Sequence, residues 1–266
     1  MVDLILRWTF GELKLGYNSP QGLELLKYSI KFAQLIFPID YDVEFYICYN
    51  NIRKSTLKEI ERFSKKYDVN LINVSDMLLN KMRNEANKNS WWKYALPRID
   101  ITRYEIIIDN DVILWEIPDI LKQSITENAL IALSDGGGKF YGDYKEIIEN
   151  IEKNLVLNAG LIGFPKGYAF NLREVFENPP KDCFFSEQGF AALNFTRYKG
   201  LKYLIPLSEI QQLNINRIDV LDLLSKHKGG HFCGCNYGPE DFWDKIYRNE
   251  IINRYKKQSK KHFNKN

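Results

Sequence analysis

The chain has 266 residues, of which 45% are hydrophobic and 14% aromatic, and its formal net charge at pH 7 is only +3. This composition supports a sizeable core and excludes intrinsic disorder, and the length fits one large α/β domain or two small ones. Charge is nearly balanced outside the last dozen residues, which argues against a nucleic-acid-binding surface. No apolar run approaches the roughly 20 residues of a membrane-spanning helix, and no signal-peptide pattern opens the sequence.

The first part of the chain alternates between strand and helix patterns. The predicted strands lie at 2–10, 43–49 and 69–74, and the predicted helices lie at 19–37 and 55–67 and begin a third time at Ser75. This order predicts a mostly parallel sheet with helices on both faces. Nucleotides bind beyond the carboxyl ends of the strands in such sheets.

The stretch 105–114 reads Glu-Ile-Ile-Ile-Asp-Asn-Asp-Val-Ile-Leu and is predicted as a strand buried on both faces. Alternation in a strand puts Asp109 and Asp111 on the same side, with Asn110 opposite. Two such carboxylates need a cation to stay charged, and oxygen ligands with positions left for phosphate suit Mn²⁺ or Mg²⁺. The alternative is a strand that ends in a simple Asx turn.

Residues 91–99 form an aromatic and basic segment just before this central strand. Lys93 and Arg98 both lie close enough along the chain to reach a diphosphate bound at the carboxylates. The alternative for either residue is a solvated cation paired with Glu85 or Asp100.

The second half continues with a helix from 118–119, a strand at 129–133 that ends at Ser134-Asp135, a strand at 155–164 and a helix at 184–195. Asn158-Ala159-Gly160 interrupts an apolar strand, and a glycine there indicates that a ligand approaches the backbone closely. Ser186 would cap the last helix, so that Glu187 lies in its first turn near the positive end of the helix dipole.

Residues 229–235 read Gly-Gly-His-Phe-Cys-Gly-Cys, and the glycines would expose His231. The chain's four cysteines are few and unevenly spaced, which fits a reducing cytoplasm better than a disulfide framework. A zinc or redox module built on His231, Cys233 and Cys235 is an alternative, but this spacing lacks the two-residue gap of common zinc knuckles.

Taken in chain order, these motifs resemble the GT-A nucleotide-sugar glycosyltransferases, most closely the glycosyltransferase family 8 type. The matching blocks are Ile-Ile-Ile-Asp109-Asn110-Asp111, Asn158-Ala159-Gly160, Glu187-Gln188 and His231-Phe232-x-Gly234. The resemblance implies an α/β GT-A fold, which is Rossmann-like, with a mostly parallel central sheet flanked by helices. It implies a single catalytic domain at 1–253, with a nucleotide-binding half at 1–115 and an acceptor and sugar half at 116–253, before a basic tail at 254–266.

The resemblance also implies a site. The divalent metal, Mn²⁺ or Mg²⁺, would be held by Asp109, Asp111 and His231. The catalytic pair beside the anomeric carbon would be Glu187 and Gln188. Candidate donor-binding residues are Trp8, Asn110, Asn158, Ala159 and Gly160, together with Lys93 or Arg98 at the diphosphate. The family's Lys-Pro-Trp after the His-Phe-x-Gly block is absent, and Tyr237 or Lys228 would have to replace its lysine.

The resemblance implies a metal-dependent transferase that moves a sugar from a nucleotide diphosphate, a UDP-sugar being favoured, to a glycan or lipid-linked acceptor with retention. Two alternatives stay open. One is a sugar-1-phosphate nucleotidyltransferase, against which the single glycine after the first strand counts. The other is a protein that binds a carbohydrate or metal without catalysis.

The C-terminal tail carries five lysines within ten residues, Lys256, Lys257, Lys260, Lys261 and Lys265. We expect it to be solvated and frayed from Arg254 onward. In a cytoplasmic protein, such a cluster would give weak attachment to an anionic membrane at its inner face. The alternative is a terminus that only aids solubility.

Overall fold

The computed structural model describes residues 2–11, 20–77, 90–172, 175, 180–181, 183–213, 218–233 and 243–263. Its strands are β1 (Val2–Gly11), β2 (Tyr41–Asn50), β3 (Asn70–Asn73), β4 (Tyr104–Asp109), β5 (Val112–Leu114), β6 (Leu130–Ser134), β7 (Leu157–Phe164), β8 (Lys202–Ile205), β9 (Ile210–Gln212) and β10 (Gly229–His231). Its α-helices are α1 (Pro20–Ile36), α2 (Lys54–Tyr67), α4 (Asp119–Glu127), α5 (Lys145–Ile151), α7 (Cys183–Arg197), α8 (Val220–Lys226) and α9 (Arg248–Phe263). Shorter helical turns are η1 (Phe37–Ile39), η2 (Ser90–Tyr94), η3 (Gly142–Tyr144) and the π-helix η4 (Trp243–Tyr247).

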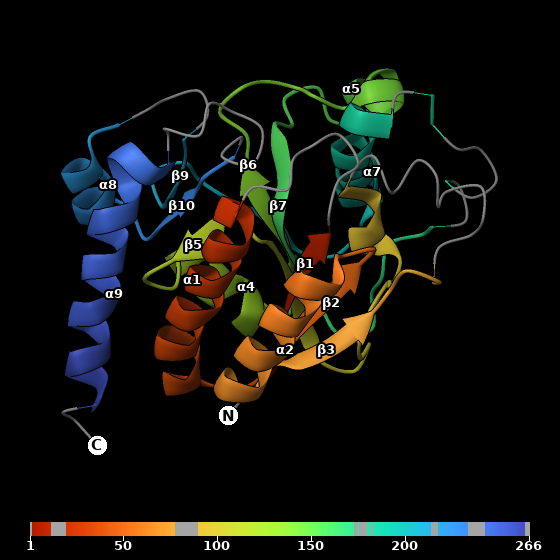
Figure 1. Cartoon of the computed structure of the whole chain (residues 1–266). Helices are drawn as coiled ribbons and strands as arrows, with labels where there is room; N and C mark the ends of the chain where they lie inside the picture. The colour runs from red at the N-terminus through yellow and green to blue at the C-terminus, as the bar shows by residue number, and fades with distance from the viewer. Residues whose placement is uncertain are drawn as a thin grey trace.

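The described strands form a seven-stranded sheet in the order β3-β2-β1-β4-β7-β6-β8 and a three-stranded sheet in the order β5-β10-β9. In the large sheet only β7 runs antiparallel to its neighbours, so the predicted mostly parallel α/β sheet is confirmed. Buried side chains of α1, α2 and α4 cover one face, and those of α5 and α7 cover the other (Figure 1).

The predicted strand at 105–114 is in fact two strands in different sheets. β4 ends at Asp109, the chain turns at Asn110 and Asp111, and β5 then pairs antiparallel with β10. Val112 lies opposite His231 in this pairing, and the Phe232 N–H donates to the Asp111 carbonyl at 2.8 Å. The sequence suggested continuity because Val112, Ile113 and Leu114 are as apolar as the residues of β4. The backbone partner of β5, however, is β10 of the small sheet.

The pairing of β6 with β7 is irregular at the Asn158-Ala159-Gly160 block. Ala132 pairs with Ile162, but the next residue, Leu133, pairs with Asn158. Three residues of β7 therefore face one step of β6, which releases part of their backbone from the ladder. Such irregularities often adjoin functional sites because they re-aim backbone and side chains.

Two expectations at helix ends need correction. Helix α7 begins at Cys183, so Ser186 lies inside its first turn and is no N-cap. The Ser186 hydroxyl instead accepts a hydrogen bond from the Asp143 N–H of η3 at 3.0 Å. For the helix predicted to begin at Ser75, residues 75–77 form a turn and the rest lies outside the described residues.

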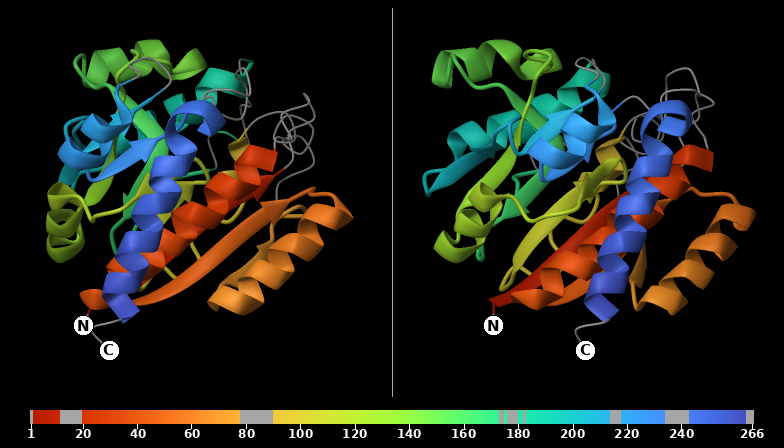
Figure 2. Two further views of the ribbon diagram at one scale, coloured as in Figure 1. Left: turned by 60° about the vertical axis from the view of Figure 1, so that its left-hand side comes forward. Right: turned by 90° about the vertical axis from the view of Figure 1, so that its left-hand side faces the viewer.

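The C-terminal segment from Arg254 is not frayed, because it continues α9 as far as Phe263. Tyr255 packs edge-on against Tyr28 and Phe32 of α1, and the Gln258 amide donates to the Trp115 carbonyl at 3.1 Å. α9 runs beside α1 in both views of Figure 2. Lys256, Lys257, Lys260 and Lys261 remain exposed, and Lys261 also lines a hollow between α9 and the end of α1. In the described ranges, no helix combines the length and hydrophobicity that crossing a bilayer requires.

Candidate active site

Lys93 joins three of the sequence motifs in one cluster. It is carried by η2, and its ammonium is almost fully buried. The Nζ atom lies 2.9 Å from Asp109 Oδ1, 3.0 Å from Glu187 Oε1 and 3.3 Å from the Ala159 carbonyl. An ammonium has three N–H donors, so these three acceptors use its full capacity. The end of β4, the bulge of β7 and the second turn of α7 are thereby held together. Glu187 is the fifth residue of α7, so its predicted place in the first turn is wrong.

The charges of this cluster are strongly perturbed. Burial by itself lowers the pKa of Lys93, but Asp109 and Glu187 outweigh burial and raise that pKa above its ordinary value. The pKa of Asp109 is raised to about 6, because burial and the neighbouring Asp111 outweigh the attraction of Lys93. Lys93 is therefore a permanent cation, whereas burial and the neighbouring Asp111 make Asp109 easier to protonate than an exposed aspartate.

Tyr94, the residue after Lys93, fixes Glu187 from a second side. Its hydroxyl donates to Glu187 Oε1 at 2.9 Å, and its ring packs against Phe190 of α7 with centroids 5.2 Å apart. Burial and then the Glu187 carboxylate raise the pKa of Tyr94 well above its usual value. The hydroxyl consequently stays a donor, and Glu187 receives both an ammonium and a phenol at the same oxygen.

His231 lies at the end of β10, beside the turn that carries Asp111. Its Nε2 is 3.4 Å from Asp111 Oδ1, and the imidazole is buried. Burial favours the neutral ring, but the Asp111 carboxylate raises the pKa of His231 well above its ordinary value. The ring lies against Gly160, where an added β-carbon would be 2.7 Å from His231 Cε1. The glycine predicted to admit a ligand therefore admits the imidazole.

The donor types around this turn suit a hard divalent cation, since two carboxylates and one imidazole are available. Asp111 and His231 converge, but Asp109 is paired with Lys93. Over the ranges that the structure describes, no three or more His, Cys, Asp or Glu side chains lie close enough together to hold a metal ion. Asp109 would join Asp111 and His231 around an ion by giving up part of its pairing with Lys93.

Asp135 also belongs to this site, although the sequence motifs did not assign it a role. It follows β6 directly and is 7% exposed. Its Oδ2 accepts hydrogen bonds from the amides of Asn158 at 3.3 Å and Gln188 at 3.1 Å. A carboxylate at the carboxyl end of a predicted strand was the signal that could have identified it.

Three predicted donor-binding residues lie outside the cluster. Trp8 is fully buried in the core, where its indole donates to Ser29 Oγ at 2.7 Å and stacks on Phe45. The Asn110 amide donates to the Gly22 carbonyl of α1 at 3.1 Å. The Trp8 indole is therefore part of the core, and its donor-binding role stays a prediction that these contacts do not support.

Arg98 is the third such residue, and the structure separates it from Lys93. Its guanidinium pairs with Glu105 at the start of β4 and donates to the carbonyls of Pro165, Tyr168, Asp100 and Arg103. Glu105 and Asp109 are four residues apart, about 13 Å along a strand. Arg98 is thus a buried cation paired at the opposite end of β4 from Asp109, and this placement favours Lys93 over Arg98 as the candidate at the diphosphate.

Lys228 does not lie at the site either, since its Nζ pairs with Asp119 at 2.5 Å and Glu209 at 3.4 Å. Tyr237, Gly234 and Cys235 are outside the described residues. Cys233 is described and carries a free thiol.

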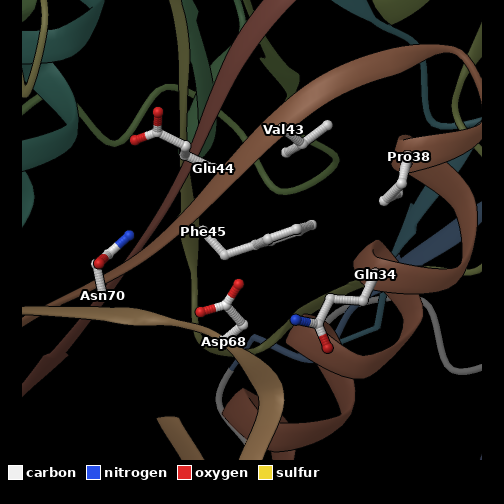
Figure 3. Close-up of a pocket in the computed structure, with 7 residues that line it drawn as sticks. All are labelled: Gln34, Pro38, Val43, Glu44, Phe45, Asp68 and Asn70. Carbon is white, nitrogen blue, oxygen red and sulfur yellow. The ribbon is translucent and has the colours of Figure 1, made fainter. Parts of the chain in front are cut away.

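Among the described residues, two of the hollows lie away from these side chains. One of about 350 Å³ lies between the end of α1, β2 and the link from α2 to β3, where Glu44 and Asp68 flank Phe45 (Figure 3). The other, of about 290 Å³, lies between the end of α1 and α9, beside Trp115. Neither is lined by a residue of the Lys93 or His231 clusters.

Comparison with known proteins gives the fold a name. No family model and no curated protein sequence matches the chain. Among solved structures, the galactosyltransferase LgtC, in complex with donor and acceptor sugar analogs, is similar over 94% of this chain and 99% of its own, with a TM-score of 0.55 at 14% identity. The glycosyltransferase GlyE of Streptococcus pneumoniae TIGR4 has a TM-score of 0.58 at 12% identity over the whole of this chain.

The bifunctional glycosyltransferase WbbM is also similar, with a TM-score of 0.52 at 13% identity over 95% of this chain. The chain spans 64% of GlyE and about half, 51%, of WbbM. The fold of this chain is therefore the GT-A fold of these glycosyltransferases, which confirms the fold predicted from the order of the motifs.

Proposed function

We propose that this chain is a glycosyltransferase that moves a sugar from a nucleotide diphosphate donor to an acceptor. The observation that carries the proposal is the convergence of four separate motifs at the carboxyl end of β4. Lys93 links Asp109 to Glu187, and Gly160 receives the imidazole that pairs with Asp111. The GT-A fold supports this reading because its solved examples include glycosyltransferases.

In this proposal, Asp109, Asp111 and His231 hold Mn²⁺ or Mg²⁺. When bound, such an ion acts as a Lewis acid that neutralises the charge developing on the leaving diphosphate. Lys93 keeps Asp109 and Glu187 in place and supplies a fixed positive charge beside them. We assign it, and not Arg98, to the diphosphate side of the site.

Glu187 and Gln188 are proposed to lie beside the anomeric carbon. A glycosyl transition state resembles an oxocarbenium ion, so a carboxylate or amide oxygen of the protein close to this carbon lowers the barrier. Asn158, Ala159 and Gly160 would line the sugar pocket, since the bulge in β7 begins directly after Asn158 and leaves Ala159 and Gly160 unpaired with β6. A UDP-sugar donor, a glycan or lipid-linked acceptor and retention of configuration are part of the same proposal.

The experiment is a calorimetric titration of the purified chain with UDP-, GDP- and CDP-sugars, with and without Mn²⁺, followed by NMR of the first product. We expect metal-dependent binding of one nucleotide-sugar class and release of its nucleoside diphosphate. Release of pyrophosphate from a nucleoside triphosphate and a sugar 1-phosphate would favour the nucleotidyltransferase instead. Absence of binding to every nucleotide sugar would reject the proposal.

We also propose that the outer side of α9 contacts an anionic membrane surface. Lys256, Lys257, Lys260 and Lys261 are exposed together, and each contributes on the order of 1 kcal/mol beside an anionic leaflet. The helix is docked on α1, so contact would be peripheral and reversible. A lipid-linked acceptor and a location at the inner membrane face would follow from this contact.

A further inference from the structure

The hydrogen bonds around Asp135 form a directed network. Besides the two side-chain amides that donate to Oδ2, the Gly137 N–H donates to Oδ1 at 2.7 Å. Asp135 itself is anchored because its own N–H donates to the Val156 carbonyl at 3.0 Å. The carboxylate accepts three donors and is nearly sealed from solvent.

The orientation of one of these amides is set independently of Asp135. The Asn158 Oδ1 accepts the Gly160 N–H at 2.8 Å, so the amide nitrogen of Asn158 has to face Asp135. A carboxylate has no hydrogen to donate, so Gln188 likewise turns its amide nitrogen toward Asp135. The carbonyl oxygen of Gln188 is then directed away from Asp135.

We propose that Asp135 is a positioning residue that fixes the side-chain amide of Gln188, so that its carbonyl oxygen faces the reacting carbon of the donor. The inference rests on the proposed function for the nature of that carbon. An amide oxygen carries partial negative charge and stabilises a developing oxocarbenium ion, whereas the amide nitrogen would present positive hydrogens to it. The two orientations of Gln188 have nearly the same shape and opposite effects.

Asp135→Asn separates this role from simple packing. If the oxygen of the new amide faces Gln188 and Asn158, its nitrogen meets the Gly137 N–H. If the oxygen faces Gly137, its nitrogen meets two other amide nitrogens, and Gln188 is free to flip. In either arrangement the new NH₂ group faces another N–H donor and a hydrogen bond is lost, although the side chain keeps its size.

The test uses the full chain labelled with ¹⁵N in glutamine side chains, in which the Gln188 amide is assigned from its loss in Gln188→Glu. We expect the wild-type Gln188 amide to exchange slowly with water and Asp135→Asn to speed this exchange and shift the resonance. With the donor identified by titration, we expect kcat to fall on the order of 10- to 100-fold while KM for the donor changes little.

Asp143→Asn is the matched control, since Asp143 is an exposed aspartate in η3 whose carboxylate accepts the Lys181 N–H. It should leave both the resonance and kcat unchanged. An unshifted Gln188 resonance in Asp135→Asn would overturn the inference, and so would an unchanged kcat or a loss confined to KM. A wild-type protein that transfers no sugar but shows the protected amide would reject the proposed function and keep the orientation of Gln188.

Discussion

The imidazole of His231 occupies the space into which a side chain on Gly160 would project. A β-carbon at position 160 would lie 2.7 Å from His231 Cε1 and 2.9 Å from Asn158 Oδ1, closer than such atoms can approach. Gly160 is therefore a packing partner of the His231 imidazole, and a side chain at position 160 would displace that ring.

Gly160→Ala should displace the imidazole from Asp111. We expect the free energy of unfolding to fall by about 1–3 kcal/mol, as for other overpacked sites, together with a weaker affinity for Mn²⁺. Urea unfolding and metal titration measure the two effects. In a His231→Ala background the obstructing ring is gone, so the stability cost of Gly160→Ala should shrink. An equal cost in both backgrounds would refute this account.

Asp111→Asn should abolish nucleotide-dependent binding of Mn²⁺, because it removes a charged oxygen beside His231 while keeping the shape of the turn. Calorimetry with Mn²⁺ and nucleoside diphosphate together measures the effect. Asp143→Asn, which changes an exposed aspartate outside the cluster, should bind as the wild type does. Full metal affinity and activity in Asp111→Asn would show that these are not the metal ligands.

Lys93→Met should destabilise the fold by about 3–5 kcal/mol, because it leaves Asp109 and Glu187 close together without their shared cation. Thermal and urea unfolding measure the loss. Lys226→Met provides the matched control, since the pair of Lys226 with Asp222 is exposed and such pairs contribute little. Equal losses of stability in the two variants would mean that the ion pairs of Lys93 do not stabilise this cluster.

Acid should weaken the docking of α9 through Glu24. This carboxylate accepts hydrogen bonds from Nε and Nη2 of Arg248, both at 2.7 Å, and from the indole N–H of Trp243 at 3.0 Å. Burial alone would raise the pKa of Glu24, but these partners lower it below 4.5. A depressed pKa contributes stability that is present above 4.5 and is lost as the pH falls through the lower folded-state value.

Glu24→Gln should therefore lower the melting temperature at neutral pH and have a smaller effect well below pH 4.5. Melting curves of both proteins across this range test the prediction. Asp222→Asn, in an exposed pair, should show no comparable pH dependence. A melting difference that stays constant from neutral to acid pH would exclude this linkage.

Replacement of the four exposed lysines of α9, Lys256, Lys257, Lys260 and Lys261, by Gln should reduce co-sedimentation with anionic liposomes at low salt. Removal of the whole segment would be a poor test, because Tyr255 and Gln258 pack against the body of the protein. The matched control replaces four exposed lysines of α2, Lys54, Lys58, Lys65 and Lys66. Equal sedimentation of both variants and the wild type would rule out this membrane surface.

The alternation of patterns in the first half was sufficient to predict the mostly parallel sheet, since β1 and β2 are rich in apolar residues and each is followed by a helix. The break between Asp109 and Val112 could not be predicted in this way. The apolar pattern of Val112–Leu114 predicts that β5 is buried. It does not predict which strand β5 pairs with, because the partner β10 lies more than a hundred residues later.

The choice between Lys93 and Arg98 had one overlooked signal. Glu105 is a carboxylate inside a run of buried strand residues, so it required a buried cation of its own. The Nε atoms of Arg98 and Arg7 lie 3.2 Å and 3.0 Å from the Glu105 carboxylate oxygens, which leaves Lys93 to pair with Asp109. The hydrogen bonds of Asp135 could not be predicted from the sequence, because they depend on the register shift between β6 and β7 that brings the Asn158 amide next to Asp135.

The two sheets also differ in when their strands leave the ribosome. Every described strand of the seven-stranded sheet lies within residues 2–205, whereas β9 and β10, the other strands of the small sheet, lie at 210–212 and 229–231. A nascent chain that ends before β10 can pair Asp109 with Lys93 but has no His231 to offer Asp111. Lys93 thus offsets part of the negative charge of an incompletely synthesised site. Under the proposed function, metal binding would follow translation of the C-terminal segment.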